Sequence, residues 1–174
     1  GGQAAALEVV LDEGALLLGD RAVVGPGQHG RCTLAAAGLR HDLGRDLAGA
    51  TGDDVAGLGL DAGARTLHVR CLHLADGRPY QYEDRWINLA AVPAAGSEDF
   101  ETASPNEWLV ANAPFSRAQY SFGAARADPE EAQALRLDAG EAVFVAERTT
   151  WIADRAITHV RMVHPPSHRV VTWI

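Results

Sequence analysis

Residues 65–88, RTLHVRCLHLADGRPYQYEDRWIN, decide the fold of this chain because they predict two strands joined by a tight turn. From Arg65 to Leu74 apolar and polar residues alternate, which is the period of a strand with one buried face. Ala75-Asp76-Gly77 is the predicted turn, because Gly tolerates the left-handed backbone that short loops require. Pro79–Asn88 is then the partner strand, and the stretch folds back as an antiparallel hairpin.

The length of this turn decides which side chains share a face, since a slip of one residue turns every side chain over. A three-residue loop pairs Leu74 with Arg78. It places these residues on one face: Cys71, His73, Gln81, Glu83 and Arg85. A two-residue turn at Asp76-Gly77 would instead bring Tyr80, Tyr82 and Trp86 beside His73. We predict the three-residue loop because it groups an imidazole, a carboxylate and a guanidinium, which form complementary hydrogen bonds.

A second hairpin and two helices follow the first hairpin. Glu141–Ile152 and Arg155–His164 predict a long hairpin, and Arg169–Ile174 predicts a last strand. The runs SPNE from Ser104 and DPEE from Asp128 each combine a capping residue, a proline and a glutamate, which together start a helix. The sum is an α+β fold, an antiparallel sheet of about six strands with helices over one face.

The first part of the chain predicts a small separate unit. Residues 6–11 carry apolar side chains at helical spacing, and a glycine at position 14 would stop that helix before a small hairpin. This order resembles the end of a winged helix-turn-helix, although the Arg and Lys content of a recognition helix is missing. We interpret residues 1–28 as a remnant of such a domain plus a linker. A ligand-binding domain then occupies residues 29–174, with a strand or helix over 31–39 and a helix starting at Thr51.

Composition limits the functions open to the chain. Its net charge of −8 repels the phosphate backbone of nucleic acids, so the chain alone is expected to bind DNA poorly. Two cysteines, Cys32 and Cys71, do not make a disulfide framework, and the reducing cytoplasm is the expected location. Residues 25–30 spell G-x-G-x-x-G. Without a βαβ unit around it, that run does not indicate a nucleotide cofactor.

Four stretches in order resemble the UTRA domain, the ligand-binding half of one branch of the GntR-type regulators. They are LHLADGRP (Leu72–Pro79), EDRWIN (Glu83–Asn88), SPNEWL (Ser104–Leu109) and ERTTW (Glu147–Trp151). The last three together are similar to the histidine-utilisation repressors. The resemblance covers about residues 29–174, judged by motif order.

The resemblance implies a chorismate-lyase-like fold, a pocket between sheet and helices, and a homodimer. It implies a sensor without catalytic activity or cofactor, with urocanate, the first product of histidine breakdown, as effector. DNA would be bound only through a winged-helix domain that is largely missing here. The alternative is a chorismate-lyase-like enzyme acting on a small aromatic or cyclic acid, in which Glu83 and Arg85 would serve catalysis.

We expect the effector pocket to be formed from these residues: His73, Glu83, Arg85, Ser104, Tyr120, Arg148, Trp151 and Arg161. An acid would place its carboxylate on Arg85 or at the helix N-terminus after Ser104, where free N–H groups and the helix dipole attract anions. Its ring would lie toward Glu83, against an aromatic wall from Trp151 or Tyr120. Each residue also has a structural interpretation, such as capping for Ser104 and packing for Trp151.

Three histidines near the C-terminus, His159, His164 and His168, raise the question of a metal site. A zinc site needs three or four converging ligands, often spaced one turn apart on a helix. Pro165-Pro166 exclude a helix between His164 and His168. We therefore predict no metal site.

Overall fold

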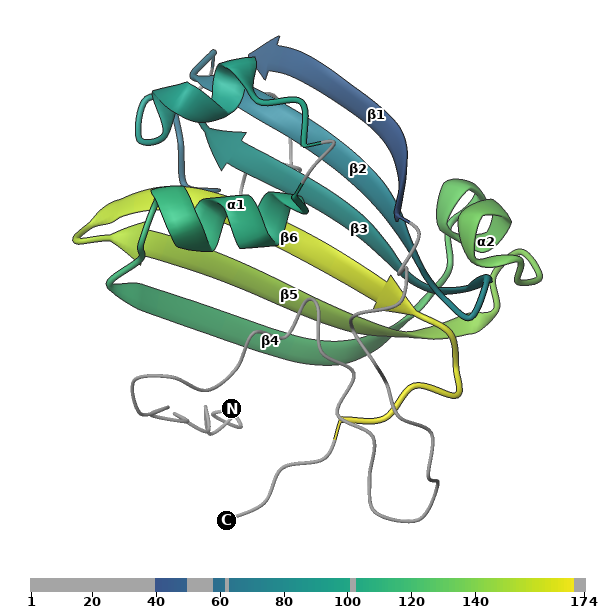
Figure 1. The fold of residues 1–174 in the computed structure, drawn as a ribbon. Coiled ribbons are helices and arrows are strands. Elements are labelled where there is room, and N and C mark those ends of the chain that lie inside the picture. Colours follow the sequence, from purple (N-terminus) through teal and green to yellow (C-terminus); the bar gives the residue numbers. More distant parts are fainter. Residues whose placement is uncertain (1–39, 50–57, 62, 101–102, 171–174) are drawn as a thin grey trace, which may run out of the picture.

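The hairpin of residues 65–88 belongs to one antiparallel sheet with the strand order β1-β2-β3-β6-β5-β4 (Figure 1). The computed structural model describes residues 40–49, 58–61, 63–100 and 103–170. The strands are β1 (Arg40–Gly49), β2 (Arg65–Ala75), β3 (Arg78–Asn88), β4 (Arg117–Arg126), β5 (Ala142–Ile152) and β6 (Arg155–His164). The helical elements are η2 (Pro93–Ser97), α1 (Pro105–Asn112) and α2 (Pro129–Leu135). The predicted α+β fold with about six strands is confirmed.

Both predicted helix starts are capping boxes. Ser104 accepts a hydrogen bond from the backbone N–H of Glu107, whose side chain accepts one from the backbone N–H of Ser104. Asp128 and Glu131 make the same reciprocal pair at the start of α2. Each cap satisfies donors that the first helical turn leaves free and contributes about 1 kcal/mol to stability.

The turn of the first hairpin differs from the prediction. Ala75 pairs with Arg78, so the loop has two residues, Asp76 and Gly77, and both have the positive φ of a type I′ turn. The prediction of a three-residue loop is therefore wrong. The register then shifts: Leu74 pairs with Pro79 but His73 pairs with Gln81, which leaves an extra residue, Tyr80, as a bulge on β3.

This bulge restores the face arrangement that the three-residue loop was meant to produce. Cys71 pairs with Glu83 and His73 with Gln81, so odd-numbered residues of both strands share one face. Glu83 and Arg85 lie on that face and are buried. Tyr82 lies on the other face, where its hydroxyl donates to Glu130 of α2. The predicted grouping of titratable side chains is confirmed, although the turn beside it has a different length.

The two faces of the sheet are covered by different helices. On the first, which we call the α1 face, these residues pack with Leu109 of α1 and with η2: Leu67, Val69, Cys71 and Ile87. On the second, the α2 face, these residues pack with Ala132 and Leu135 of α2: Tyr82, Val143, Val145 and Val163. Figure 1 shows α1 across the middle of the sheet and α2 near one end. We predicted helices over one face, and η2 and α1 occupy the α1 face. The third helix, α2, covers the opposite face, because strands such as β5 carry apolar residues on both sides.

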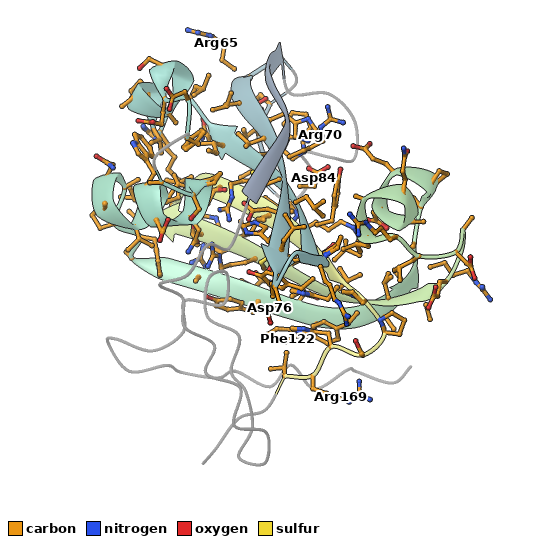
Figure 2. All side chains as sticks on the ribbon, turned by 45° about the vertical axis from the view of Figure 1, so that its right-hand side comes forward. Arg65, Arg70, Asp76, Asp84, Phe122 and Arg169 are labelled. Carbon is orange, nitrogen blue, oxygen red and sulfur yellow. The ribbon has the colours of Figure 1, made fainter. Side chains whose placement is uncertain are left out.

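Figure 2 shows Arg70 and Asp84 extending from the sheet on the side of α2. Arg70 donates to Glu130 of α2 over 2.8 Å, and Asp84 contacts His68 over 2.9 Å. Ion pairs as well as apolar packing therefore stabilise the α2 face. No helix among the described residues has the length and apolar character needed to cross a membrane.

Several predictions concern parts of the chain outside the described residues. These are the remnant at residues 1–28, the strand or helix over 31–39 and the helix starting at Thr51. The last strand, predicted over 169–174, is partly testable. Arg169 and Val170 are not in a strand, because Pro165-Pro166 end β6 and the chain turns back, with the N–H of His168 bonded to the carbonyl of Pro165.

Candidate functional site

Three predicted site residues form one buried chain of hydrogen bonds on the α1 face. His73 Nε2 lies 2.9 Å from Glu83 Oε2, and Arg85 Nε donates to Glu83 Oε1 over 2.6 Å. The side chains of Glu83 and Arg85 are each 1% exposed, so this carboxylate is out of contact with solvent. The bulge at Tyr80 sets the strand register that brings the three side chains together.

Glu83 is held in its ionised form. Burial by itself would raise the pKa of the Glu83 carboxyl, but the Arg85 guanidinium and the hydrogen bond from His73 outweigh burial and hold that pKa well below its usual value. An ionised carboxylate only accepts hydrogen bonds, so His73 donates its Nε2–H to it. Both Glu83 oxygens are thus engaged within the protein.

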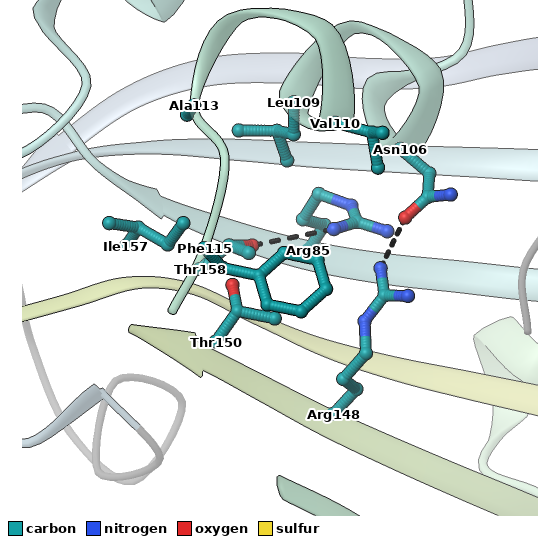
Figure 3. A pocket seen from close by; sticks show the side chains of 10 residues that line it. All are labelled: Arg85, Asn106, Leu109, Val110, Ala113, Phe115, Arg148, Thr150, Ile157 and Thr158. Atoms are coloured by element: carbon teal, nitrogen blue, oxygen red, sulfur yellow. Dashed lines mark hydrogen bonds between the residues drawn. The ribbon is translucent and has the colours of Figure 1, made fainter. Parts of the chain in front are cut away.

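A pocket lies on the α1 face between α1 and the strands β3, β5 and β6 (Figure 3). The hollow measures about 230 Å³ when its open mouth is included, and its enclosed part, about 10 Å³, has room for about one water molecule. The polar lining residues are Arg85, Asn106, Arg148, Thr150 and Thr158. The apolar ones are Leu109, Val110, Ala113, Phe115 and Ile157. One side of the pocket is therefore rich in hydrogen-bond donors, and the other is apolar.

Arg148 is the charged group of this pocket that lacks a counterion. It is 4% exposed, and no carboxylate of the described residues lies within ion-pairing distance of it. Its Nη2 donates to Oδ1 of Asn106, as Figure 3 shows, and its guanidinium lies 5.9 Å from the Tyr120 ring. Burial and then repulsion from Arg85 lower the pKa of Arg148. A guanidinium keeps its proton in proteins, so a positive charge stays buried here.

Three buried polar atoms of the lining residues have no hydrogen-bond partner among the described residues. They are Arg148 Nε, Asn106 Nδ2 and Thr150 Oγ1. Leaving such atoms unpaired costs about 1–3 kcal/mol each, so a native structure normally satisfies them. A guanidinium, an amide N–H and a hydroxyl can all donate hydrogen bonds to one oxyanion of a ligand. The arrangement can therefore bind a carboxylate.

Ser104 does not line this pocket. Its side chain is used by the capping box, and it reaches the site only by starting α1, the helix that carries Asn106 and Leu109. The structural role predicted for Ser104 is confirmed. Its direct contact with an effector stays a prediction.

The other three predicted site residues divide between the faces. Tyr120 lies on β4 directly opposite Arg148 and so belongs to the α1 face. Trp151 packs with Trp86 and Leu58. Arg161 lies on the α2 face, where its Nε donates a hydrogen bond to Glu131 over 3.0 Å. Trp151 is three positions from Arg148 on one strand, and an odd spacing places side chains on opposite faces. The structure does not bring Trp151 and Arg161 to the pocket.

The residues predicted from the sequence did not include Asn106, Thr150 or Thr158. A signal existed for two of them. Asn106 lies in the first turn of the helix whose start was recognised, and Thr150 follows Arg148 by two positions and must share its face. Thr158 lies opposite Thr150 on β6, a pairing that depends on the register of the second hairpin.

The C-terminal histidines form an aromatic contact. The rings of His164 and His168 stack with centroids 3.8 Å apart, and Nδ1 of His164 lies 3.0 Å from the carbonyl of Tyr80. Burial and repulsion from His168 lower the pKa of His164 to about 4, so its ring is neutral near pH 7. His159 instead contacts Thr149 over 2.8 Å. Within the described ranges, no three His, Cys, Asp or Glu side chains are grouped as metal ligands.

Comparison with protein families and curated proteins gives consistent relatives. The UTRA domain model matches residues 42–169. A histidine utilization repressor of Pseudomonas putida is 32% identical over 143 residues, which are 79% of this chain and 57% of that protein. One of Klebsiella aerogenes is 29% identical over 63% of this chain and 46% of its own length. The chain thus spans about half the length of the curated relatives it matches.

Solved structures show the same fold. The C-terminal domain of a histidine utilization repressor from Pseudomonas syringae matches with a TM-score of 0.73 and 27% identity, over 78% of this chain and 96% of that one. The effector domain of PhnF from Mycobacterium smegmatis matches with a TM-score of 0.67 and 22% identity, over 76% and 83% of the two chains.

Proposed function

Because the chain belongs to the UTRA domain family, we propose that it is the effector-binding part of a bacterial transcriptional repressor of histidine-utilisation genes. The effector is a small carboxylic acid, with urocanate as the first candidate, and it binds between α1 and the sheet. The names of the relatives support the regulatory role. Such a regulator works in the cytoplasm, where its operator DNA lies.

One observation carries the choice of ligand. Arg148 is buried in the pocket without a carboxylate of the described residues to neutralise it, and the unpaired donors of Asn106 and Thr150 belong to the same lining. A buried charge of this kind is costly until it is paired. A ligand carboxylate supplies the counterion and accepts the free hydrogen bonds in one step.

The opposite wall of the pocket suits the rest of such an acid. Leu109, Phe115 and Ile157 offer an apolar surface, and Phe115, which follows the helix in a loop, is 44% exposed. A flat ring joined to a carboxylate would lie against these side chains with its acid group on Arg148. Urocanate has this shape.

A binding role suits Glu83 better than a catalytic one. A general acid or base must reach the atom that gains or loses the proton. Glu83 is buried behind Arg85, does not line the pocket, and has both oxygens engaged. The chorismate-lyase-like enzyme is therefore the weaker alternative, and a returned, unchanged ligand would distinguish a sensor from an enzyme.

Isothermal calorimetry with three ligands tests the proposed effector class. Urocanate is expected to bind more tightly than histidine, because the ammonium group of histidine would be repelled by Arg148. It is also expected to bind more tightly than glucosamine 6-phosphate, whose doubly charged group exceeds the charge of the site. Tighter binding of the sugar phosphate would contradict the proposal.

The proposal also covers DNA and assembly. With a net charge of −8, the chain alone is expected to give no sequence-specific retention in a gel-shift assay over a range of salt concentrations. Operator binding would belong to a separate winged-helix domain of the regulator. We further propose a homodimer in solution. Light scattering that shows only monomer at micromolar concentration would contradict that part.

A further inference from the structure

The charged groups around the pocket differ in their access to a ligand. Arg85 and Arg148 both line it, whereas Glu83 contacts Arg85 from behind and does not. His73 contacts the other oxygen of Glu83, over 2.9 Å, and lines no part of the pocket. Two guanidinium groups therefore lie at the pocket with one carboxylate behind them, an excess of one positive charge among these three groups.

Glu83 cannot bind the ligand directly, but its charge acts through space. Its Oε1 accepts from Arg85 and its Oε2 from His73, and its side chain is 1% exposed. Little water reaches such a buried site to screen charges, so each unit charge within several ångströms changes ligand affinity strongly. Glu83 offsets Arg85 and leaves Arg148 as the guanidinium that a ligand must neutralise.

We propose that Glu83 determines the charge class of the ligand: with Glu83 ionised behind Arg85, the pocket selects anions of one negative charge over anions of two. A singly charged acid neutralises the site. A doubly charged group would leave one negative charge buried, and this carries a large desolvation cost. The inference deepens the proposed function and rests on it only in placing the ligand in this pocket.

Two probes with the same head-group shape test this selection. Benzenesulfonate carries one negative charge, and at mildly alkaline pH phenylphosphonate carries two. The dissociation constants of both are measured by NMR titration for the wild type and for Glu83→Gln. Gln keeps the shape of the side chain and removes its charge. The ratio of the two constants is expected to shift toward the phosphonate by about tenfold or more, as removal of a nearby charge in a poorly screened site requires.

Glu131→Gln is the matched control. Glu131 is also buried and also paired with an arginine, Arg161, but it lies on α2 against the opposite face. This variant changes the overall charge by the same amount, and Gln at this position keeps the capping box. Its ratio is expected to stay within about twofold of the wild-type value, because distant sites act independently.

A double variant keeps the test decisive if Glu83→Gln does not fold. Glu83→Gln with Arg85→Gln removes one charge of each sign and so retains the net charge of the wild-type pocket. Its phosphonate-to-sulfonate ratio is expected to remain within about twofold of the wild type, because the net charge beside the pocket is unchanged. An unchanged ratio in Glu83→Gln, or a shift of about tenfold in the double variant or in Glu131→Gln, would overturn the proposal.

The outcomes for this proposal and for the proposed function are separate. If urocanate does not bind but the ratio shifts in Glu83→Gln, the effector assignment fails and the charge selection stands. If urocanate binds but the ratio does not shift, the effector assignment stands and the role of Glu83 fails. Absence of binding of both probes to every variant would also overturn the role of Glu83.

Discussion

Arg148→Met is expected to weaken binding of urocanate by about 100-fold while leaving the free protein at least as stable as the wild type. A charge-assisted hydrogen bond contributes about 1.5–3 kcal/mol, and a guanidinium can offer two to one carboxylate. Methionine fills much of the same volume without a charge. Without ligand, the variant no longer buries a positive charge that lacks a counterion among the described residues.

Calorimetry measures the affinity and urea denaturation the stability of this variant. Arg161→Met is the control, because Arg161 pairs with Glu131 on the α2 face and its loss should leave urocanate affinity unchanged. The two variants remove the same charge from opposite sides of one sheet. Retained affinity in Arg148→Met, or a comparable loss in Arg161→Met, would show that urocanate binds outside this pocket.

Arg85→Met is expected to lower the free energy of unfolding by about 3–5 kcal/mol. Removing one partner of a buried ion pair leaves the other uncompensated, and here Glu83 would keep only its contact with His73. Adding Glu83→Gln to Arg85→Met should recover much of this loss, since the carboxylate that lost its partner is then removed as well. Equal stability of the single and double variants in urea would contradict the account of the pair.

The pH dependence of stability gives the same pair an independent signature. In the wild type the pKa of Glu83 is held below its unfolded value. The pair's contribution is therefore present above the usual carboxyl pKa of about 4 and is lost as pH falls below it. In Arg85→Met the carboxyl protonates more readily, so the stability gap between wild type and variant should narrow on acidification. A gap that stays constant with pH would exclude an ionised Glu83 as its cause.

Local patterns predicted the elements of this fold well. Alternation identified β2, the turn after it predicted β3 as its partner, and β5 and β6 were predicted as a second hairpin. SPNE and DPEE both mark capped helices. These signals are local, because caps and strand faces depend on neighbours within a few residues. β1 was not predicted, since Arg40–Gly49, RHDLGRDLAG, lacks regular alternation and even shifts register between Asp42 and Gly44.

Features that depend on tertiary context were not predicted. The hairpin sequence permits either turn length, and only the bulge at Tyr80 reconciles a two-residue turn with Glu83 and Arg85 on the α1 face. The sequence also does not say which face a capped helix covers, so α2 was not assigned to its own face. For the site, Arg85 and Arg148 were found as charged residues in motifs, whereas Asn106 has an ordinary place in a first helical turn.

The central claim is that Arg148, Asn106 and Thr150 together bind the carboxylate of a small acid. A crystal structure of the chain with urocanate tests it most directly. We expect carboxylate oxygens about 3 Å from Arg148 Nε, Asn106 Nδ2 and Thr150 Oγ1, with the ring against Phe115. A carboxylate bound elsewhere, for example beside Arg161 on the α2 face, with these three donors still unpaired, would contradict it.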